Sequence, residues 1–240
     1  MISLVVPAYN EEHFLPGLLD SVDAAAAAYR AAGGAVEVIV ADNGSTDGTA
    51  RIAAARGCRV VPAVPRTIAA VRNAGARAAR GELLAFVDAD ARIHPGTFQE
   101  IGRRLADERI IGGTTGVRLD RWSLGLAATW AVFLPLVWIT GFDTGVVFCR
   151  RVDFVAVAGY DESLRFAEDV AFLYALWRLG RRTHRRLVRV RRVKAIASTR
   201  KFDDHGDWHY FGLIWHGITH YFGSGRMDEV ADRYWYKPGR

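Results

Sequence analysis

The first ninety residues alternate between short apolar runs and longer segments whose apolar positions follow helical spacing. The apolar runs are Ile2–Val6, Val36–Ala41, Arg59–Val61 and Leu83–Val87. Each is rich in β-branched or aliphatic residues and ends at a polar, Gly or Pro residue. This pattern is typical of buried parallel strands.

Three helices are expected between these strands. An apolar stripe from Phe14 to Val22 predicts the first, and Ser45 or Thr46 is a suitable N-cap for a second that runs to about Arg56. An Ala-rich segment, Ile68–Ala79, predicts the third. The alternation of strand and helix predicts an α/β fold with a mostly parallel central sheet flanked by helices.

Polar residues follow three of the expected strands. Tyr9, Asn10 and Glu11 come after the first, Asp42 after the second, and an Asp-Ala-Asp segment (88–90) after the fourth. Because ligands of such sheets bind beyond the carboxyl ends of the strands, we expect these side chains to form one site.

The second half of the chain has a less regular pattern, and its expected elements are two strands, three helices and one turn. These are a strand Val146–Cys149, a helix from about Val152, a turn at 159–161, a helix from Glu168 to about Gly180, a strand Leu187–Ala197 and a helix Asp207–Phe222. No internal repeat or low-complexity linker interrupts the chain, so residues 1–240 are expected to form a single domain.

Residues 122–142 carry no charge and contain five Trp or Phe side chains. Their length suits a membrane span, but Pro135 and several polar and Gly residues lower the hydrophobicity. A span would also separate Asp90 from Asp169. We therefore expect a buried helix, and docking of this segment on a lipid surface is the second interpretation.

The formal net charge of +6 is concentrated in one segment. Residues 178–201 hold eleven basic side chains and no acid, whereas the remainder carries 21 basic and 26 acidic residues. A local basic segment favours a phosphate-bearing ligand or an anionic membrane over nucleic acid, and we expect no nucleic-acid partner. Arg outnumbers Lys by 29 to 3, which indicates a GC-rich, bacterial genome.

The two cysteines, Cys58 and Cys149, are isolated, and no basic leader precedes the first strand. These features favour a cytoplasmic location, with peripheral contact at the inner face of the membrane through 122–142 and 178–194.

Asp88 and Asp90 supply two hard oxygen ligands at the end of an apolar strand. Such a pair suits Mg²⁺ or Mn²⁺ bound to a diphosphate. An acidic turn in which Asp90 caps the next segment would give the same residues.

Four motifs, in order, resemble family-2 glycosyltransferases, which are nucleotide-sugar enzymes of the GT-A fold. They are VVPAYNEE (5–12), VIVADNGSTDGT (38–49), RNAGARAARGELLAFVDAD (72–90) and FAEDVAF (166–172). The similarity extends from residue 2 to about 202. It implies a nucleotide-binding half at about 1–90, an acceptor and catalytic half at about 91–202, and a C-terminal helix and tail at 203–240.

The resemblance also implies roles for the donor-binding residues. Pro7, Tyr9 and Glu11 would line the nucleotide pocket, and Asp42 would accept hydrogen bonds from the base. Arg72 would lie near the base or the diphosphate. Tyr9 as a half-buried strand-end aromatic, Asp42 as part of an Asx turn and Arg72 as an exposed helix residue are the alternatives.

Three further roles follow. Asp88 and Asp90 would bind Mg²⁺ or Mn²⁺ with the diphosphate of a UDP-, GDP- or TDP-sugar. Asp169, or Glu168 in its place, would be the base of a single inverting displacement, unless the pair only complements the helix dipole.

Arg200 and Lys201 resemble the late basic motif that closes on the diphosphate. The Gln-x-x-Arg-Trp motif of processive members is absent, so a non-processive enzyme is expected. His205 or His209 is a candidate third metal ligand, although packing on an aromatic helix explains them as well.

The acceptor stays open between a glycan, a lipid and a small molecule, and the oligomeric state is not indicated. Two other functions compete with transfer: a nucleotidyltransferase of related fold, and a catalytically silent protein that binds a sugar nucleotide or a lipid.

Overall fold

The computed structural model describes residues 1–63, 67–121, 123, 145–165 and 167–198. The chain divides into two compact units, Met1–Arg118 with Phe142–Ala197 and Leu119–Gly141 with Ser198–Arg240. Almost all of the second unit lies outside the described residues, so the fold below is that of the first. The helices expected within 122–142 and 207–222 also lie outside them, and the single-domain organisation with its three segments stays a prediction.

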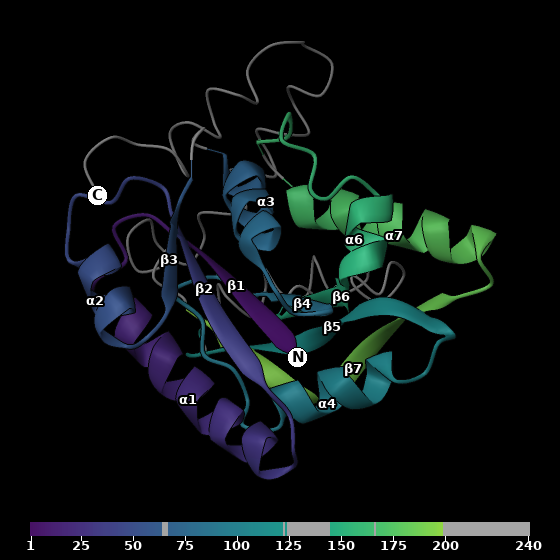
Figure 1. Ribbon diagram of the computed structural model, residues 1–240, viewed down its shortest axis with the longest axis horizontal. Coiled ribbons are helices and arrows are strands. Elements are labelled where there is room, and N and C mark those ends of the chain that lie inside the picture. The colour runs from purple at the N-terminus through teal and green to yellow at the C-terminus, as the bar shows by residue number, and fades with distance from the viewer. Residues whose placement is uncertain (64–66, 122, 124–144, 166, 199–240) are drawn as a thin grey trace. The chain divides into compact units, whose positions relative to one another are not determined.

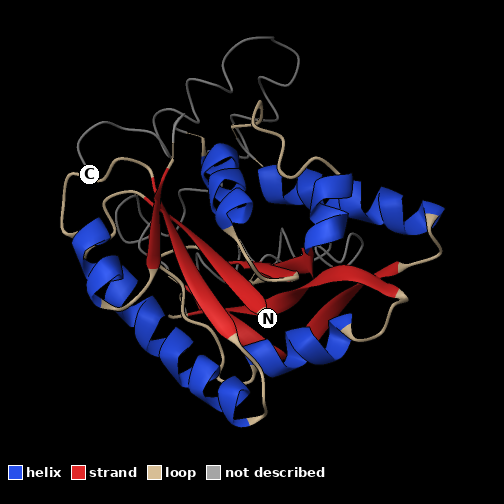
Figure 2. Cartoon of the chain, in the orientation of Figure 1, coloured by secondary structure: helices blue, strands red, loops and turns tan. Residues whose placement is uncertain are grey.

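A seven-stranded sheet forms the centre of the described structure, drawn in red in Figure 2. Its strands are β1 (Ile2–Ala8), β2 (Val36–Asp42), β3 (Arg59–Pro62), β4 (Leu83–Phe86), β5 (Ile110–Leu119), β6 (Val147–Arg150) and β7 (Arg186–Ala197). Their order is β3-β2-β1-β4-β6-β5-β7. The pairs among β3, β2, β1 and β4 are parallel, whereas β6 is antiparallel to both β4 and β5. The expected mostly parallel central sheet is confirmed.

Helices cover both faces of this sheet (Figure 1). They are α1 (Leu15–Ala31), α2 (Thr49–Ala55), α3 (Ile68–Ala78), α4 (Thr97–Leu105), α6 (Arg151–Ala156) and α7 (Glu168–Arg182). Buried residues of α1, α2 and α4 share one apolar core with the sheet, and those of α3, α6 and α7 share another. None of the helices in the described ranges is long and apolar enough to cross a membrane.

Helix α3 lies unusually close to the sheet. Gly75 faces β1, and a Cβ at this position would overlap with Cγ1 of Val5. In a parallel βαβ unit the helix runs back from the carboxyl ends of the strands, so its first turns lie at the ligand-binding edge. Arg72, one turn before Gly75, is therefore held near that edge.

One expected helix start is wrong. Helix α2 begins at Thr49, with Gly48 at the N-cap position, and not after Ser45 or Thr46. The side-chain oxygen of Asp47 instead accepts a hydrogen bond from the backbone N–H of Thr49 at 2.9 Å. Helix α4 and strand β5 were not anticipated from the sequence.

Candidate active site

Two loops at the carboxyl ends of β1 and β2 are joined by hydrogen bonds. The backbone N–H of Asn10 donates to Oγ of Ser45 at 3.0 Å, and Oδ1 of Asn10 accepts from the N–H of Thr46 at 2.8 Å. The N–H of Glu11 donates to Oγ1 of Thr49 at 2.7 Å. Ser45 and Thr46 thus join the two loops and do not cap a helix.

Glu12 extends the same connection. Its N–H donates to Oδ2 of Asp47 at 3.1 Å, and its Oε2 accepts from the N–H of Gly48 at 2.8 Å. We name residues 10–12 and 45–49 together the loop clamp.

Asp42 lies at the end of β2, directly beside the end of β1. Pro7 pairs with Ala41 and Ala8 with Asp42 in the parallel register. The Ser45 hydroxyl donates to Oδ1 of Asp42, and the Asp42 carboxylate also accepts from the Ser45 backbone N–H at 3.3 Å. The Asp42 carboxylate therefore holds the turn at Ser45, three residues on, and its binding of a base stays a prediction.

Tyr9 and Glu11 are half-buried beside this strand end. The structure brings Pro7, Tyr9, Glu11 and Asp42 to the same edge of the sheet, where the sequence predicted a nucleotide pocket. Their roles in binding a nucleotide stay predictions.

Arg72 is the centre of a cluster of charges. Its side chain is only 5% exposed. Nη2 donates to Oδ1 of Asp88 at 2.8 Å and Nη1 donates to Oε1 of Glu168 at 2.7 Å. Oδ1 of Asp169 lies 3.0 Å from Nη1, and the guanidinium also lies over the Tyr160 ring at 5.3 Å from its centroid.

We call Arg72, Asp88, Glu168 and Asp169 the arginine cluster. It unites the first Asp of the 88–90 motif with both carboxylates at the start of α7. The exposed-helix alternative for Arg72 is wrong, because its helix faces the sheet and the residue is buried. The two carboxylates of α7 lie about eighty residues further along the chain than Asp88, and the guanidinium of Arg72 links them to it.

The electrostatics of the cluster distinguish Asp169 from Glu168. Burial raises the pKa of Asp169 to about 6, with Arg72 opposing the increase and Asp88 and Glu168 adding to it. Within the described residues, its Oδ1 is buried and makes no hydrogen bond of good geometry. A buried carboxylate with a pKa near neutrality has the properties of a general base.

The backbone around Asp169 is fixed in two places. Asn73 Nδ2 donates to the Tyr160 carbonyl at 2.8 Å, and Asn73 Oδ1 accepts from the Tyr160 N–H at 2.9 Å. Ala167 precedes α7 in the left-handed conformation, with φ 56° and ψ 27°. That conformation costs about 1–2 kcal/mol for a residue with a Cβ, and it directs the first turn of α7 toward Arg72.

Asp88 and Asp90 are compatible with a divalent cation. Both are hard oxygen donors, Asp88 is 60% exposed and Asp90 is half-buried. No three His, Cys, Asp or Glu side chains among the described residues gather closely enough to bind a metal ion by themselves. This donor set fits Mg²⁺ or Mn²⁺, which proteins often bind through one or two carboxylates and the phosphates of a substrate.

The end of β7 lies beside the segment that follows Asp90. Arg92 and Ile196 form an antiparallel bridge, with N–H to carbonyl distances of 2.9 and 2.8 Å. Arg200 and Lys201, and the candidate ligands His205 and His209, lie beyond the described residues. Their expected roles stay predictions.

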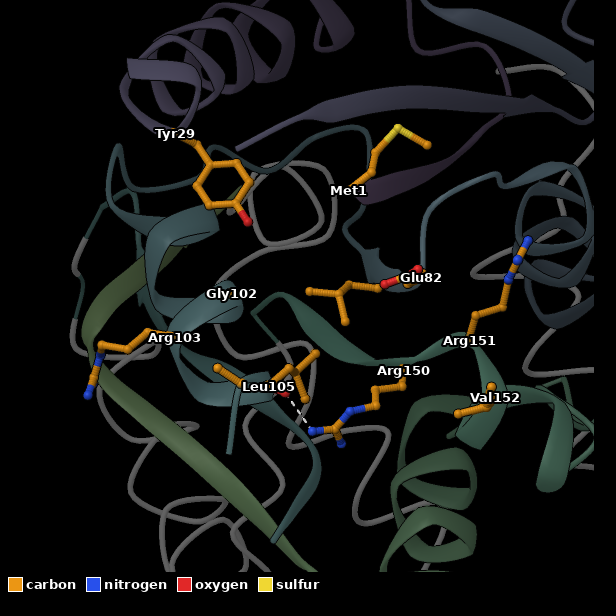
Figure 3. A pocket seen from close by; sticks show the side chains of 11 residues that line it. Met1, Tyr29, Glu82, Gly102, Arg103, Leu105, Arg150, Arg151 and Val152 are labelled. Atoms are coloured by element: carbon orange, nitrogen blue, oxygen red, sulfur yellow. Dashed lines mark hydrogen bonds between the residues drawn. The ribbon is translucent and has the colours of Figure 1, made fainter. Parts of the chain in front are cut away.

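A hollow at the opposite ends of the strands contains none of the predicted site residues. It is lined by Met1, Tyr29, Glu82, Arg103 and Arg150 among others (Figure 3). Arg150 donates there to the backbone carbonyl of Leu105, so its guanidinium stabilises the local backbone and is not directed at a ligand. The chemistry-bearing groups therefore belong to the carboxyl edge of the sheet.

Similarity to known proteins shows which family the chain belongs to. Residues 3–150 match the model of glycosyl transferase family 2, which is more than half of the chain. The chain belongs to glycosyltransferase family 2. The match includes the loop clamp, Asp42, Arg72 and the 88–90 motif, and it ends before Glu168 and Asp169.

One relative of this glycosyltransferase is an undecaprenyl-phosphate 4-deoxy-4-formamido-L-arabinose transferase of Pseudomonas paraeruginosa. It is 36% identical over 139 residues, which are 51% of this chain and 39% of that protein. The chain therefore matches well under two thirds of that relative's length.

Two solved structures share the GT-A fold of the chain. S. aureus TarS 1–349 in complex with UDP-GlcNAc matches with a TM-score of 0.64 and 20% identity. The match covers 82% of this chain and 58% of the TarS chain. Glucosyl-3-phosphoglycerate synthase from Mycobacterium tuberculosis, in complex with Mn²⁺, UDP and phosphoglyceric acid, matches with a TM-score of 0.62 and 22% identity. This match covers 88% of this chain and 75% of the synthase chain. At these identities the likeness establishes the fold alone.

The sequence identified the members of the arginine cluster but not their contacts. Arg72 and Glu168 are 96 positions apart, and no local pattern indicates that they meet. The role of Asn73 in holding the Tyr160 backbone was missed as well. Its only signal is its position next to Arg72 on a helix face that packs on the sheet.

Proposed function

We propose that the chain is a metal-dependent, inverting glycosyltransferase that moves a sugar from a nucleotide-sugar donor to a hydroxyl or phosphate acceptor. The observation that carries the proposal is the arginine cluster. The buried guanidinium of Arg72 lies within 3.0 Å of carboxylate oxygens from Asp88 in the 88–90 motif and from Glu168 and Asp169 at the start of α7. A donor diphosphate and an acceptor could therefore meet there.

On the donor side, Pro7, Tyr9 and Glu11 would line the nucleoside pocket. Asp42 would accept hydrogen bonds from N–H groups of the base, and Tyr9 would offer a stacking face. Arg200 and Lys201 would neutralise the diphosphate as it leaves. UDP-, GDP- and TDP-sugars are the donor classes to test, and a relative in the fold comparison was solved with UDP and Mn²⁺.

The cation would be held by Asp90 and Asp88. When bound, Mg²⁺ or Mn²⁺ supplies positive charge to the diphosphate leaving group.

On the acceptor side, Asp169 would take the proton of the acceptor hydroxyl while that oxygen attacks the anomeric carbon. The new C–O bond forms as the bond to the diphosphate oxygen breaks, and the electron pair leaves with the nucleoside diphosphate. A single displacement inverts the anomeric centre, and no carboxylate nucleophile is needed. A pKa of about 6 leaves Asp169 ionised and sufficiently basic at neutral pH.

Glu168 would serve a different purpose. The Glu168 carboxylate accepts a hydrogen bond from Arg72 at 2.7 Å and would hold that guanidinium in place. This leaves Asp169 for the role of base. The structure thus supports Asp169 over Glu168 as the base.

The acceptor is proposed to be a lipid-linked group. One relative carries undecaprenyl phosphate in its name. On a lipid phosphate the attacking oxygen would belong to the phosphate, and Asp169 would take the proton of its P–OH group. A glycan or small-molecule acceptor is the competing class.

A donor panel tests the proposal directly. The full chain is incubated with UDP-, GDP- and TDP-sugars and Mn²⁺, and the released nucleotide is identified. Nucleoside diphosphate is the expected product. Release of sugar 1-phosphate, with the nucleoside monophosphate as the group transferred, would instead indicate a nucleotidyltransferase, and stabilisation by a donor without any release would indicate a silent binding protein.

Three variants test the assigned roles. Asp90→Ala and Asp169→Asn should each lower the turnover number by about 10²–10⁴-fold, whereas Asp23→Asn, an exposed carboxylate of α1, should leave it unchanged. Donor binding should survive Asp169→Asn. Wild-type activity that persists in EDTA would refute the metal role.

A further inference from the structure

The outer face of α7 carries an apolar and aromatic stripe that no other part of the described chain covers. Val170, Tyr174 and Trp177 are 43%, 50% and 43% exposed. Their spacing of four and three residues places them on one side of the helix. The opposite side, with Phe172, Leu173 and Leu176, packs in the core.

The two aromatic rings of this stripe are ordered against each other. Tyr174 and Trp177 stack at 5.5 Å between centroids with 23° between planes, and the guanidinium of Arg181 lies 5.8 Å from the Trp177 centroid. Large aromatic side chains at this exposure lose hydrophobic stabilisation to water unless a partner covers them. Their arrangement indicates a surface with a partner.

The charge next to the stripe has one sign. Arg178, Arg181 and Arg182 are exposed at its C-terminal end. From Val170 to Ala197 the chain contains no Asp or Glu. A partner of this face must therefore accept both apolar rings and positive charge.

A face that combines Trp and Tyr with Arg and has no acid is characteristic of a helix at an anionic membrane surface. We propose that the outer face of α7, defined as Val170, Tyr174, Trp177, Arg178, Arg181 and Arg182, docks on the anionic surface of a lipid bilayer. The apolar rings would enter the headgroup region, and the arginines would pair with lipid phosphates.

The position of the face gives the docking a purpose. Asp169 lies eight residues before Trp177, which is about 12 Å along an α-helix. Docking would therefore hold the proposed base close to the bilayer surface, where a lipid-linked acceptor carries its reactive group. This step rests on the proposed function, whereas the docking does not.

Vesicle binding of the full chain tests the docking. The protein is sedimented with vesicles of phosphatidylcholine alone and with vesicles that contain equal parts of phosphatidylglycerol. Binding is expected only to the anionic vesicles and should weaken with salt. Arg181→Gln with Arg182→Gln should weaken it about 25-fold, since each arginine near the surface contributes about fivefold.

Tyr174→Ser with Trp177→Ser should weaken binding roughly tenfold or more. The matched control is Val152→Ser with Val155→Ser, which removes two valines of α6 that are more exposed but lie outside the face. It should bind as the wild type does. Equal loss in the control, binding to neutral vesicles, or no binding at all would overturn the proposal.

Donor hydrolysis by the same samples separates the two hypotheses. None of the substituted residues belongs to the arginine cluster or the loop clamp, so metal-dependent release of nucleoside diphosphate should survive in all variants. If release fails everywhere while vesicles bind, the proposed function is wrong. If vesicles do not bind while release is intact, the docking is wrong.

Discussion

Arg72→Met is the perturbation that tests the arginine cluster most directly. The substitution keeps an unbranched apolar stem in place of the arginine stem but removes the charge and the five N–H donors of the guanidinium. Glu168 and Asp169 are largely buried, so solvent does not replace the guanidinium as their partner. Leaving buried charge without its partner costs about 3–5 kcal/mol.

The Asp88 contact adds little to this sum. Its side chain is mostly exposed, and an exposed pair contributes about 0–1 kcal/mol. Protonation of Asp169 offsets part of the loss, so we expect the free energy of unfolding to fall by about 3 kcal/mol at pH 8. For a chain of this size that corresponds to a Tm lowered by about 6–12 °C.

The pH dependence of this loss in the free energy of unfolding gives a sharper test. Arg72 lowers the pKa of Asp169, so its removal raises that pKa further above the unfolded value. A carboxyl with a raised pKa in the folded state costs stability above its unfolded pKa, and the cost disappears as the pH falls and the folded state binds the proton. The difference between wild type and variant should therefore be largest at pH 8 and shrink toward pH 5.

Urea denaturation followed by circular dichroism from pH 5 to pH 8 measures this difference. Arg77→Met is the control, since Arg77 lies on the same helix but is exposed and makes only a 3.6 Å pair with Glu162. It should change stability by less than about 0.5 kcal/mol. The reasoning fails if Arg72→Met matches the control at pH 8, or if its deficit grows on acidification.

Three further predictions concern the surroundings of the cluster. The transfer rate should rise with pH through about 6 as Asp169 loses its proton, and a pH–rate profile that is flat from pH 5 to 7 would contradict its role as base. Asn73→Ala should lower the free energy of unfolding by about 2 kcal/mol, because it leaves the buried Tyr160 backbone unpaired; a loss below 0.5 kcal/mol in urea denaturation would argue against the contact. Gly75→Ala should cost about 1–3 kcal/mol through overlap with Val5, and Val5→Ala in the same chain should recover part of that loss if overlap is the cause.

The parallel part of the sheet, within residues 1–90, was predictable because its signals are local. Buried parallel strands require continuous apolar runs, and the residue after each run must leave the sheet at the same edge. Asp42 and Asp88 could therefore be assigned to one edge from the sequence alone.

The start of α2 could not be predicted from cap propensity, because that propensity ignores long-range partners. The hydroxyl of Ser45 is engaged by Asp42 and by the N–H of Asn10. A hydroxyl in these bonds is not available to the first turn of a helix. The helix begins four residues later, where Asp47 supplies the acceptor.

Strand β5 was missed for a related reason. Its Gly112 and Gly113 indicate a turn when only the local sequence is considered. In the folded chain, a Cβ at Gly113 would collide with the carbonyl of Val188 on β7. The glycines thus permit close contact between strands, and this requirement becomes visible only once β7 is in place.

The loop clamp determines how the donor side of the site would respond to a ligand. Its hydrogen bonds order Asn10, Glu11 and Glu12 before any nucleotide arrives. Binding then loses little conformational entropy in these loops, so more of the contact energy is retained as affinity. The proposed acceptor side is built differently, because its two carboxylates share one guanidinium and its backbone is held by Asn73 at Tyr160. Substitutions in α7 and its surroundings could therefore alter the proposed acceptor side while the loop clamp keeps its shape.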